Sequence, residues 1–161
     1  MFVNARAIIE RDTPSGTEIV IQTRNKPQEG GTSIELPGGR VEEFESLIQA
    51  VKREVLEETG LTLTYIDGVV TRVKAQTKDT QVECMQPFAV YQTTQGPVDS
   101  MGVYFRCQAE GSLLAVGDDT LHPQWVPIEL IAQWMARDAG RFGWIDRAGL
   151  LFYLKYRQLL S

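Results

Sequence analysis

Residues 46–59 carry the strongest structural signal in the chain, because the sequence defines both ends of a helix there. Ser46 and Gln49 have the spacing of a capping box, in which each side chain satisfies an N–H group at the helix start. Gly60 stands where a left-handed C-terminal cap is needed. At about 100° per residue, the apolar side chains of this region fall on one side, which we expect to be buried: Phe44, Leu47, Ile48, Val51 and Val55.

Three glutamates border this apolar stripe. Glu54 and Glu58 are one helical turn apart, and Glu57 neighbours both. Like charges at this spacing repel each other, and more strongly when they are partly desolvated, so we expect positive charge among them. Lys52 and Arg53 supply some of it, and Arg53 can pair with Glu57. The carboxylate oxygens are suitable ligands for Mg²⁺ or Mn²⁺. The alternative is that these glutamates form a solvent-exposed helix face, which is the more common role of a Glu-rich helix.

The glutamates belong to a longer pattern, whose defined positions are Gly39, Glu45, Arg53-Glu54-Val55, Glu57-Glu58 and Gly60-Leu61. This pattern resembles the Nudix box, and every defined position is filled. A chance match at all of these positions is very improbable at typical residue frequencies. The resemblance therefore outweighs the reading of a merely solvated acidic face.

The resemblance implies an α/β fold, namely a Nudix-type α/β/α sandwich with a central mixed β-sheet. The box would form a loop, a helix and a second loop that present glutamates to a diphosphate. The implied metal ligands are Glu54, Glu57, Glu58 and Gly39, with one glutamate also polarising the attacking water. Arg53 and Glu45 complete the implied catalytic set by orienting the loop and the carboxylates.

The implied reaction is metal-dependent hydrolysis of a nucleoside diphosphate linked to another group, with Mg²⁺ as the cofactor and Mn²⁺ as a substitute. Subfamily markers outside the box do not match, which leaves a nucleoside triphosphate or a modified nucleotide by elimination. One alternative is a nucleotide-sensing module, although such modules commonly lose box glutamates. Another is an allylic diphosphate isomerase, for which neither Cys84 nor Cys107 has a recognisable context. Family members are often dimers, so a homodimer is compatible with the resemblance.

Candidates for substrate binding lie outside the box. Arg6 and Arg24 could contact phosphates, although exposed cations at strand ends are more common than ligand contacts. Tyr91 could stack on a base, although most large aromatic residues of such a domain belong to its core. Asp119 is the first candidate for an additional carboxylate and Glu83 the second. A solvated Gly/Asp turn explains Asp119 equally well.

The rest of the chain predicts a single domain, residues 1–161, with strands in its middle and helices around them. Strand-like runs are Val3–Ile9, Glu18–Thr23, Ser33–Leu36, Leu61–Ile66, Val69–Lys74, Val82–Tyr91 and Gly102–Ala109. Two helices are expected at residues 125–138 and 144–160.

Composition limits the possible partners. The formal net charge of −5 disfavours long nucleic acids, whereas a metal ion could reverse the local field for a small phosphorylated ligand. Cys84 and Cys107 form no CxxC pair, and His122 is the single histidine, so the sequence indicates neither a zinc site nor a disulfide. We expect both cysteines to lie in the core. The sequence shows neither a signal peptide nor an apolar run long enough to span a membrane, which favours a cytoplasmic protein.

Overall fold

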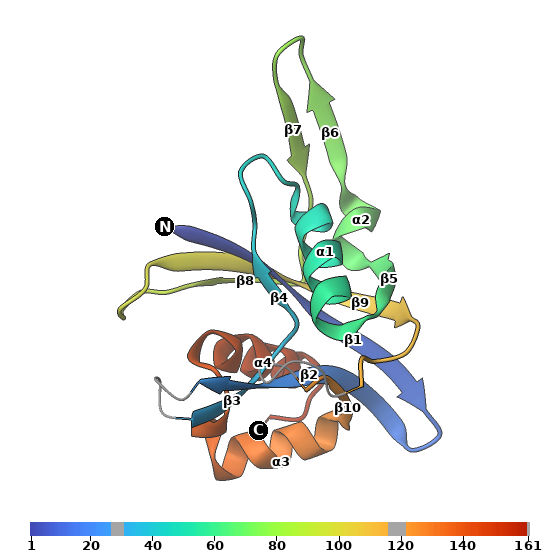
Figure 1. The fold of residues 1–161 in the computed structure, drawn as a ribbon, viewed down its shortest axis with the longest axis vertical. Helices are drawn as coiled ribbons and strands as arrows, with labels where there is room; N and C mark the ends of the chain where they lie inside the picture. The colour runs from blue at the N-terminus through green and yellow to red at the C-terminus, as the bar shows by residue number, and fades with distance from the viewer. Residues whose placement is uncertain (27–30, 116–121, 161) are drawn as a thin grey trace.

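The computed structural model describes residues 1–26, 31–115 and 122–160, which form a mixed β-sheet with helices on both faces (Figure 1). The strands are β1 (Phe2–Thr13), β2 (Gly16–Lys26), β3 (Gly31–Glu35), β4 (Gly38–Arg40), β5 (Thr62–Ile66), β6 (Val73–Gln76), β7 (Gln81–Cys84), β8 (Ala89–Gln92), β9 (Ser100–Glu110) and β10 (Gln124–Pro127). The helices are α1 (Leu47–Thr59), α2 (Asp67–Thr71), α3 (Ile128–Arg137), the 3₁₀ turn η2 (Ala139–Arg141) and α4 (Trp144–Tyr156).

Strand β1 organises the central sheet because it changes partners along its length. It runs parallel to β9, with Phe2 opposite Ser100, and antiparallel to β4, with Ala5 opposite Gly39. From Glu10 onward it pairs with β2. The order β10-β2-β1-β9-β5 results, with β3, β4 and β8 attached to β2, β1 and β9 respectively. The expected mixed sheet is confirmed.

Two apolar cores lie on opposite faces of this sheet. One packs the buried side of α1, including Val51 and Val55, against Ala5 and Ala7 of β1. The other contains Ile8 of β1 together with residues of α3 and α4. Because side chains alternate along a strand, β1 supplies both cores. The architecture is the expected α/β/α sandwich.

The predicted ends of α1 are confirmed. Ser46 is the N-cap and forms the complete capping box with Gln49, and Gly60 caps the C-terminus at a φ of 79°. Ile48, Val51 and Val55 are buried as expected. The expectation for Phe44 was wrong: this residue precedes the helix, has a φ of 59°, and its side chain is 99% exposed.

Several other expectations are corrected. Residues 67–71 form the short helix α2, so a strand begins only at Val73. The expected strand 82–91 is two strands, β7 and β8, separated by a segment that contains Pro87, which lacks a backbone donor for strand pairing. Residues 124–127 pair with β2 as β10, so the helix expected from residue 125 starts at Ile128. Strand β4 was not expected. Both cysteines were expected in the core, but only Cys107 is buried, whereas Cys84 is exposed.

Strands β6 and β7 form a separate antiparallel hairpin that projects from the body of the molecule beyond the start of α1 (Figure 1). All of β6 is exposed, and so is β7 apart from Glu83, which is partly buried.

Candidate active site on helix α1 and strand β4

The three glutamates of α1 meet very different environments. Glu58 is buried with 8% of its surface exposed, whereas the side chain of Glu54 is 18% exposed and that of Glu57 is 60% exposed. This gradient follows from their positions on the helix, since Glu58 lies over the apolar core and Glu57 is turned toward solvent. Glu54 and Glu58 therefore form the inner pair.

Arg53 binds the loop that precedes α1 to the glutamates of α1. Its guanidinium donates to Glu45 at 2.8 and 2.9 Å and to Glu54 at 2.8 Å. It also donates to the carbonyl oxygen of Arg40 at 3.2 Å, and it lies 3.6 Å from Glu57. The hydrogen bonds from Arg53 lower the pKa of Glu45 to about 2, because they favour the ionised carboxylate.

The side chain of Glu58 is bound by Gln22 of β2. Gln22 is fully buried, and its Nε2 donates a hydrogen bond to Glu58 Oε2. Burial raises the pKa of Glu58 to about 8; the hydrogen bond from Gln22 opposes this shift, while the neighbouring Glu54 adds to it. Without a cation nearby, Glu58 therefore holds its proton near neutral pH.

Gly39 of β4 lies directly beside Glu54. A Cβ atom placed on Gly39 would be 2.6 Å from Glu54 Cδ, so a larger residue would displace the carboxylate. A Cβ atom on the preceding Gly38 would meet the backbone and side chain of Arg6 instead. Strand β4 thus passes between Glu54 on one side and Arg6 on the other.

The inner pair suits a hard divalent cation. Glu54 lies close enough to Glu58 to raise its pKa, so the pair favours a proton on one of the two carboxyl groups, and a cation at the same place would replace that proton. No group of three or more His, Cys, Asp or Glu side chains gathers as a metal site in the described part of the chain, because Glu57 is turned outward toward Arg53. The geometry fits a cation held by two carboxylates, with water and phosphate oxygens completing its shell.

A cavity of about 300 Å³ lies on the Arg6 side of β4, and we call it the β4 cavity. Three arginines line it: Arg6, Arg24 and Arg40. Phe2 and Trp144 add aromatic surface that is 43% and 48% exposed respectively. Cationic groups beside exposed rings form a suitable surface for a phosphorylated aromatic ligand.

Asp146 at the start of α4 fixes Arg6 at the base of this cavity. Its side chain is 1% exposed and lies 3.3 Å from Arg6 Nη1. Asp146 also accepts hydrogen bonds from the N–H of Leu36 at 3.0 Å and from the hydroxyl of Tyr104 at 3.2 Å. Arg6 Nε is buried without a hydrogen-bond partner among the residues that the structure describes.

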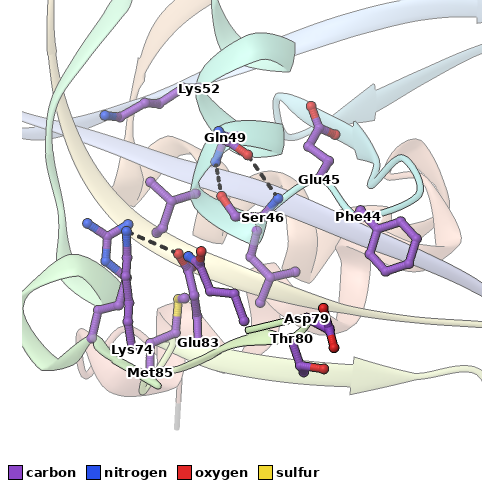
Figure 2. Close-up of a pocket in the computed structure, with 14 residues that line it drawn as sticks. Phe44, Glu45, Ser46, Gln49, Lys52, Lys74, Asp79, Thr80, Glu83 and Met85 are labelled. Atoms are coloured by element: carbon purple, nitrogen blue, oxygen red, sulfur yellow. Dashed lines mark hydrogen bonds and ion pairs between the residues drawn. The ribbon is translucent and has the colours of Figure 1, made fainter. Parts of the chain in front are cut away.

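The remaining sequence candidates lie in different places. Arg24 pairs with Glu35 at 3.5 Å beside the β4 cavity. The hydroxyl of Tyr91 accepts a 2.7 Å hydrogen bond from Asn4, a lining residue of that cavity. Glu83 pairs with Lys74 at 3.4 Å on the β6–β7 hairpin (Figure 2) and does not line the β4 cavity. Asp119 lies outside the described residues.

Comparison with known proteins assigns the chain to a family. The model of the NUDIX domain matches residues 1–143, most of the chain. The protein belongs to the Nudix family. A search of curated protein sequences gave no match.

Solved structures share the Nudix fold. A protein from Jonesia denitrificans, described as a possible asymmetric diadenosine tetraphosphate hydrolase, superimposes with a TM-score of 0.69 and 16% identity over 99% of this chain and 97% of its own. A MutT Nudix hydrolase from Burkholderia pseudomallei gives a TM-score of 0.53 at 21% identity over 80% and 84%. The MutT protein of Methanosarcina mazei gives 0.57 at 19% identity over 98% and 93%. At such identities the likeness concerns the fold. Among the described residues of this Nudix protein, no helix is long and apolar enough to cross a membrane.

Several residues around the Nudix helix were not anticipated from the sequence. Gln22 is a polar residue at the end of the apolar run Ile19–Ile21, and that interruption was the one available signal. Phe2 and Trp144 reach the same cavity from opposite ends of the chain, and Asp146 meets Arg6 across 140 residues. Local sequence patterns carry no information about such distant pairs.

Proposed function

We propose that this protein is a divalent-metal-dependent hydrolase that cleaves the phosphoanhydride bond of a nucleoside diphosphate linked to another group. Nucleoside triphosphates and modified nucleotides are its simplest substrates, and Mg²⁺ or Mn²⁺ is its cofactor. The observation that carries the proposal is the paired carboxylates of Glu54 and Glu58 beside Gly39. Two acidic groups this close demand either a shared proton or a cation.

The residues of the chain divide the work of this reaction. Glu54 and Glu58 would hold the cation, with Glu57 and the backbone of Gly39 as the further ligands that the Nudix box implies. When bound, the cation neutralises phosphate charge and lowers the pKa of a coordinated water. Arg53 and Glu45 keep Glu54 in place through the contacts described above.

The β4 cavity supports the binding of the nucleoside and its phosphates. Arg6, Arg24 and Arg40 offer positive charge to phosphate oxygens, and Phe2 and Trp144 offer exposed rings to the base. Water attacks one phosphorus atom while the bridging P–O bond breaks, and a carboxylate accepts the proton of the water. Two phosphorylated products leave, one of which keeps the nucleoside.

An assay with nucleoside di- and triphosphates and dinucleotides, run with Mg²⁺ or Mn²⁺ and followed by product analysis, tests this function. We expect Glu58→Gln and Glu57→Gln to lower kcat by orders of magnitude while the circular dichroism spectrum stays unchanged, because each substitution removes a negative charge at the cation. The matched control is Glu110→Gln, at the exposed end of β9. Full activity in both variants, or binding without turnover in the unaltered protein, would refute the proposal.

A further inference from the structure

We propose that Gln22 of β2 is a positioning residue for the cation site: its side-chain amide fixes one carboxylate oxygen of Glu58 and leaves the other to the cation. This inference rests on the proposed function, because the cation is the one that Glu54 and Glu58 would hold. Gln22 lies outside the Nudix box, which runs from Gly39 to Leu61, so the pattern that identifies the family assigns it no role.

Gln22 occupies a position of β2 where the fold would accommodate an apolar side chain. Ile19 and Ile21 pack in the core on the side of α3 and α4, and Val20 packs in the core beneath α1. Because side chains alternate along a strand, Gln22 faces α1 as Val20 does. The side chain of Gln22 is fully buried, so its amide loses its hydration, whereas a methionine of similar size would have little hydration to lose. Packing alone therefore does not account for a glutamine here.

The hydrogen bonding of Gln22 connects its side chain to Glu58 and leaves one end of the amide unused. Its Nε2 donates to Glu58 Oε2, whereas its Oε1 is buried and has no partner among the residues that the structure describes. Most buried polar side-chain atoms have at least one partner, and an amide that served only to stabilise the core would be expected to use both ends. The contact with Glu58 is therefore what distinguishes this position.

The two carboxylates of the inner pair are held by donors of different charge. Glu54 accepts a hydrogen bond from the guanidinium of Arg53, whereas the donor to Glu58 is the neutral amide of Gln22. A neutral donor orients a carboxylate without neutralising it, so the negative charge of Glu58 stays available to a cation. Residues that hydrogen-bond to metal ligands fix the orientation of those ligands in this way.

The test measures the affinity of the full chain for Mn²⁺ alone, without nucleotide, by electron paramagnetic resonance of the free ion. The variants are Gln22→Met, which removes the amide at similar size, Gln22→Asn, which keeps the amide on a shorter side chain, Glu58→Gln, and the double variant Gln22→Met/Glu58→Gln. Gln108→Met is the matched control, because Gln108 is an exposed residue of β9 outside the β4 cavity. Urea unfolding in EDTA shows whether each variant is folded.

Gln22→Met and Gln22→Asn should each weaken Mn²⁺ binding about tenfold to a hundredfold, which is the usual cost of losing a residue that orients a metal ligand. Gln108→Met should bind Mn²⁺ as the unaltered protein does. In the Glu58→Gln background, Gln22→Met should cause little further loss, because the carboxylate that it positions is gone. A role in core stability alone would lower the unfolding free energy in EDTA and leave the Mn²⁺ affinity of the folded protein unchanged.

Two results would overturn the inference: an unchanged Mn²⁺ affinity in Gln22→Met, or an equal loss from this substitution with Glu58 and with glutamine at position 58. If the unaltered protein bound Mn²⁺ but hydrolysed no nucleotide, the proposed function would fail, while the Mn²⁺ affinities would still decide the role of Gln22. If the unaltered protein bound no Mn²⁺, both would fail.

Discussion

Arg53 shows how a single side chain can set the geometry of a whole site. It donates hydrogen bonds to Glu45, to Glu54 and to the carbonyl oxygen of Arg40. The guanidinium of Arg53 therefore connects the loop before α1, helix α1 itself and the end of β4. A guanidinium is suited to this role because its five N–H donors have a fixed planar arrangement. Lysine at this position would supply the charge without that geometry.

The pKa of Glu45 provides a test at this scale. We expect its carboxyl to titrate near 2 in the folded protein, against an ordinary value of 4.5. As the pH falls below the ordinary value, the unfolded chain takes up the proton first, so the contribution to stability is complete above pH 4.5 and is lost as the pH falls toward 2. Carboxyl carbon NMR of Glu45, together with urea unfolding at several pH values, measures both effects.

Arg53→Gln is the comparison for this titration. The neutral amide cannot stabilise the carboxylate to the same degree, so the pKa of Glu45 should return toward its ordinary value and the acid-dependent loss of stability should shrink. An ordinary pKa for Glu45 in the unaltered protein would show that the Arg53 contacts are absent in solution.

Helix α1 is the element on which the candidate site depends, and its first turn is fixed by a reciprocal pair of hydrogen bonds. The N–H of Gln49 donates to Ser46 Oγ at 3.0 Å, and the N–H of Ser46 donates to Gln49 Oε1 at 3.1 Å. These bonds satisfy donors that a helix start otherwise leaves free.

We therefore expect Ser46→Ala to destabilise the protein by about 1 kcal/mol, as measured by urea unfolding. Ser46→Asp should recover most of the loss, because aspartate also accepts a hydrogen bond at an N-cap. Stability equal to the unaltered protein in Ser46→Ala would mean that this end of α1 frays in solution.

The elements differ in how well the sequence predicts them, and the reason is physical. The start and end of α1 depend on residues within one turn, and both were predicted correctly. Strand β10 exists because residues 124–127 pair with β2, about a hundred residues earlier along the chain, and nothing local marks it. Phe44 shows the same limit, since its apolar character suggested burial whereas its backbone turns it outward.

At the scale of the whole molecule, the buried pair Arg6–Asp146 joins β1 to α4. Removal of one partner leaves the other charge buried, so Asp146→Ala should cost about 3–5 kcal/mol in unfolding free energy. Arg6→Met in the same chain should recover part of that loss, because no unpaired charge then remains. Urea unfolding of the two single variants and the double variant gives the coupling energy, and strictly additive effects would contradict the role assigned to this pair.

The sequence predicts only those residues of the candidate site that lie in one short segment. The box glutamates, Arg53 and Gly39 occupy one short segment, and the spacing of that segment identified them. The lining of the β4 cavity comes mainly from strands β1, β2, β3, β4 and β9 and from helix α4, which meet only after the sheet has formed. Of that lining, the sequence suggested Arg6 and Arg24 by charge alone.

The alternation of side chains along β1 makes correct strand alignment a condition for having a site at all. Ala5 and Ala7 face α1, whereas Arg6 between them reaches the base of the β4 cavity. A shift of one residue would put the guanidinium beneath the helix and two methyl groups at the phosphate-facing wall. A misaligned molecule would therefore be both less stable and unable to bind its ligand, so that, for this chain, errors in folding and losses of function should be observed together.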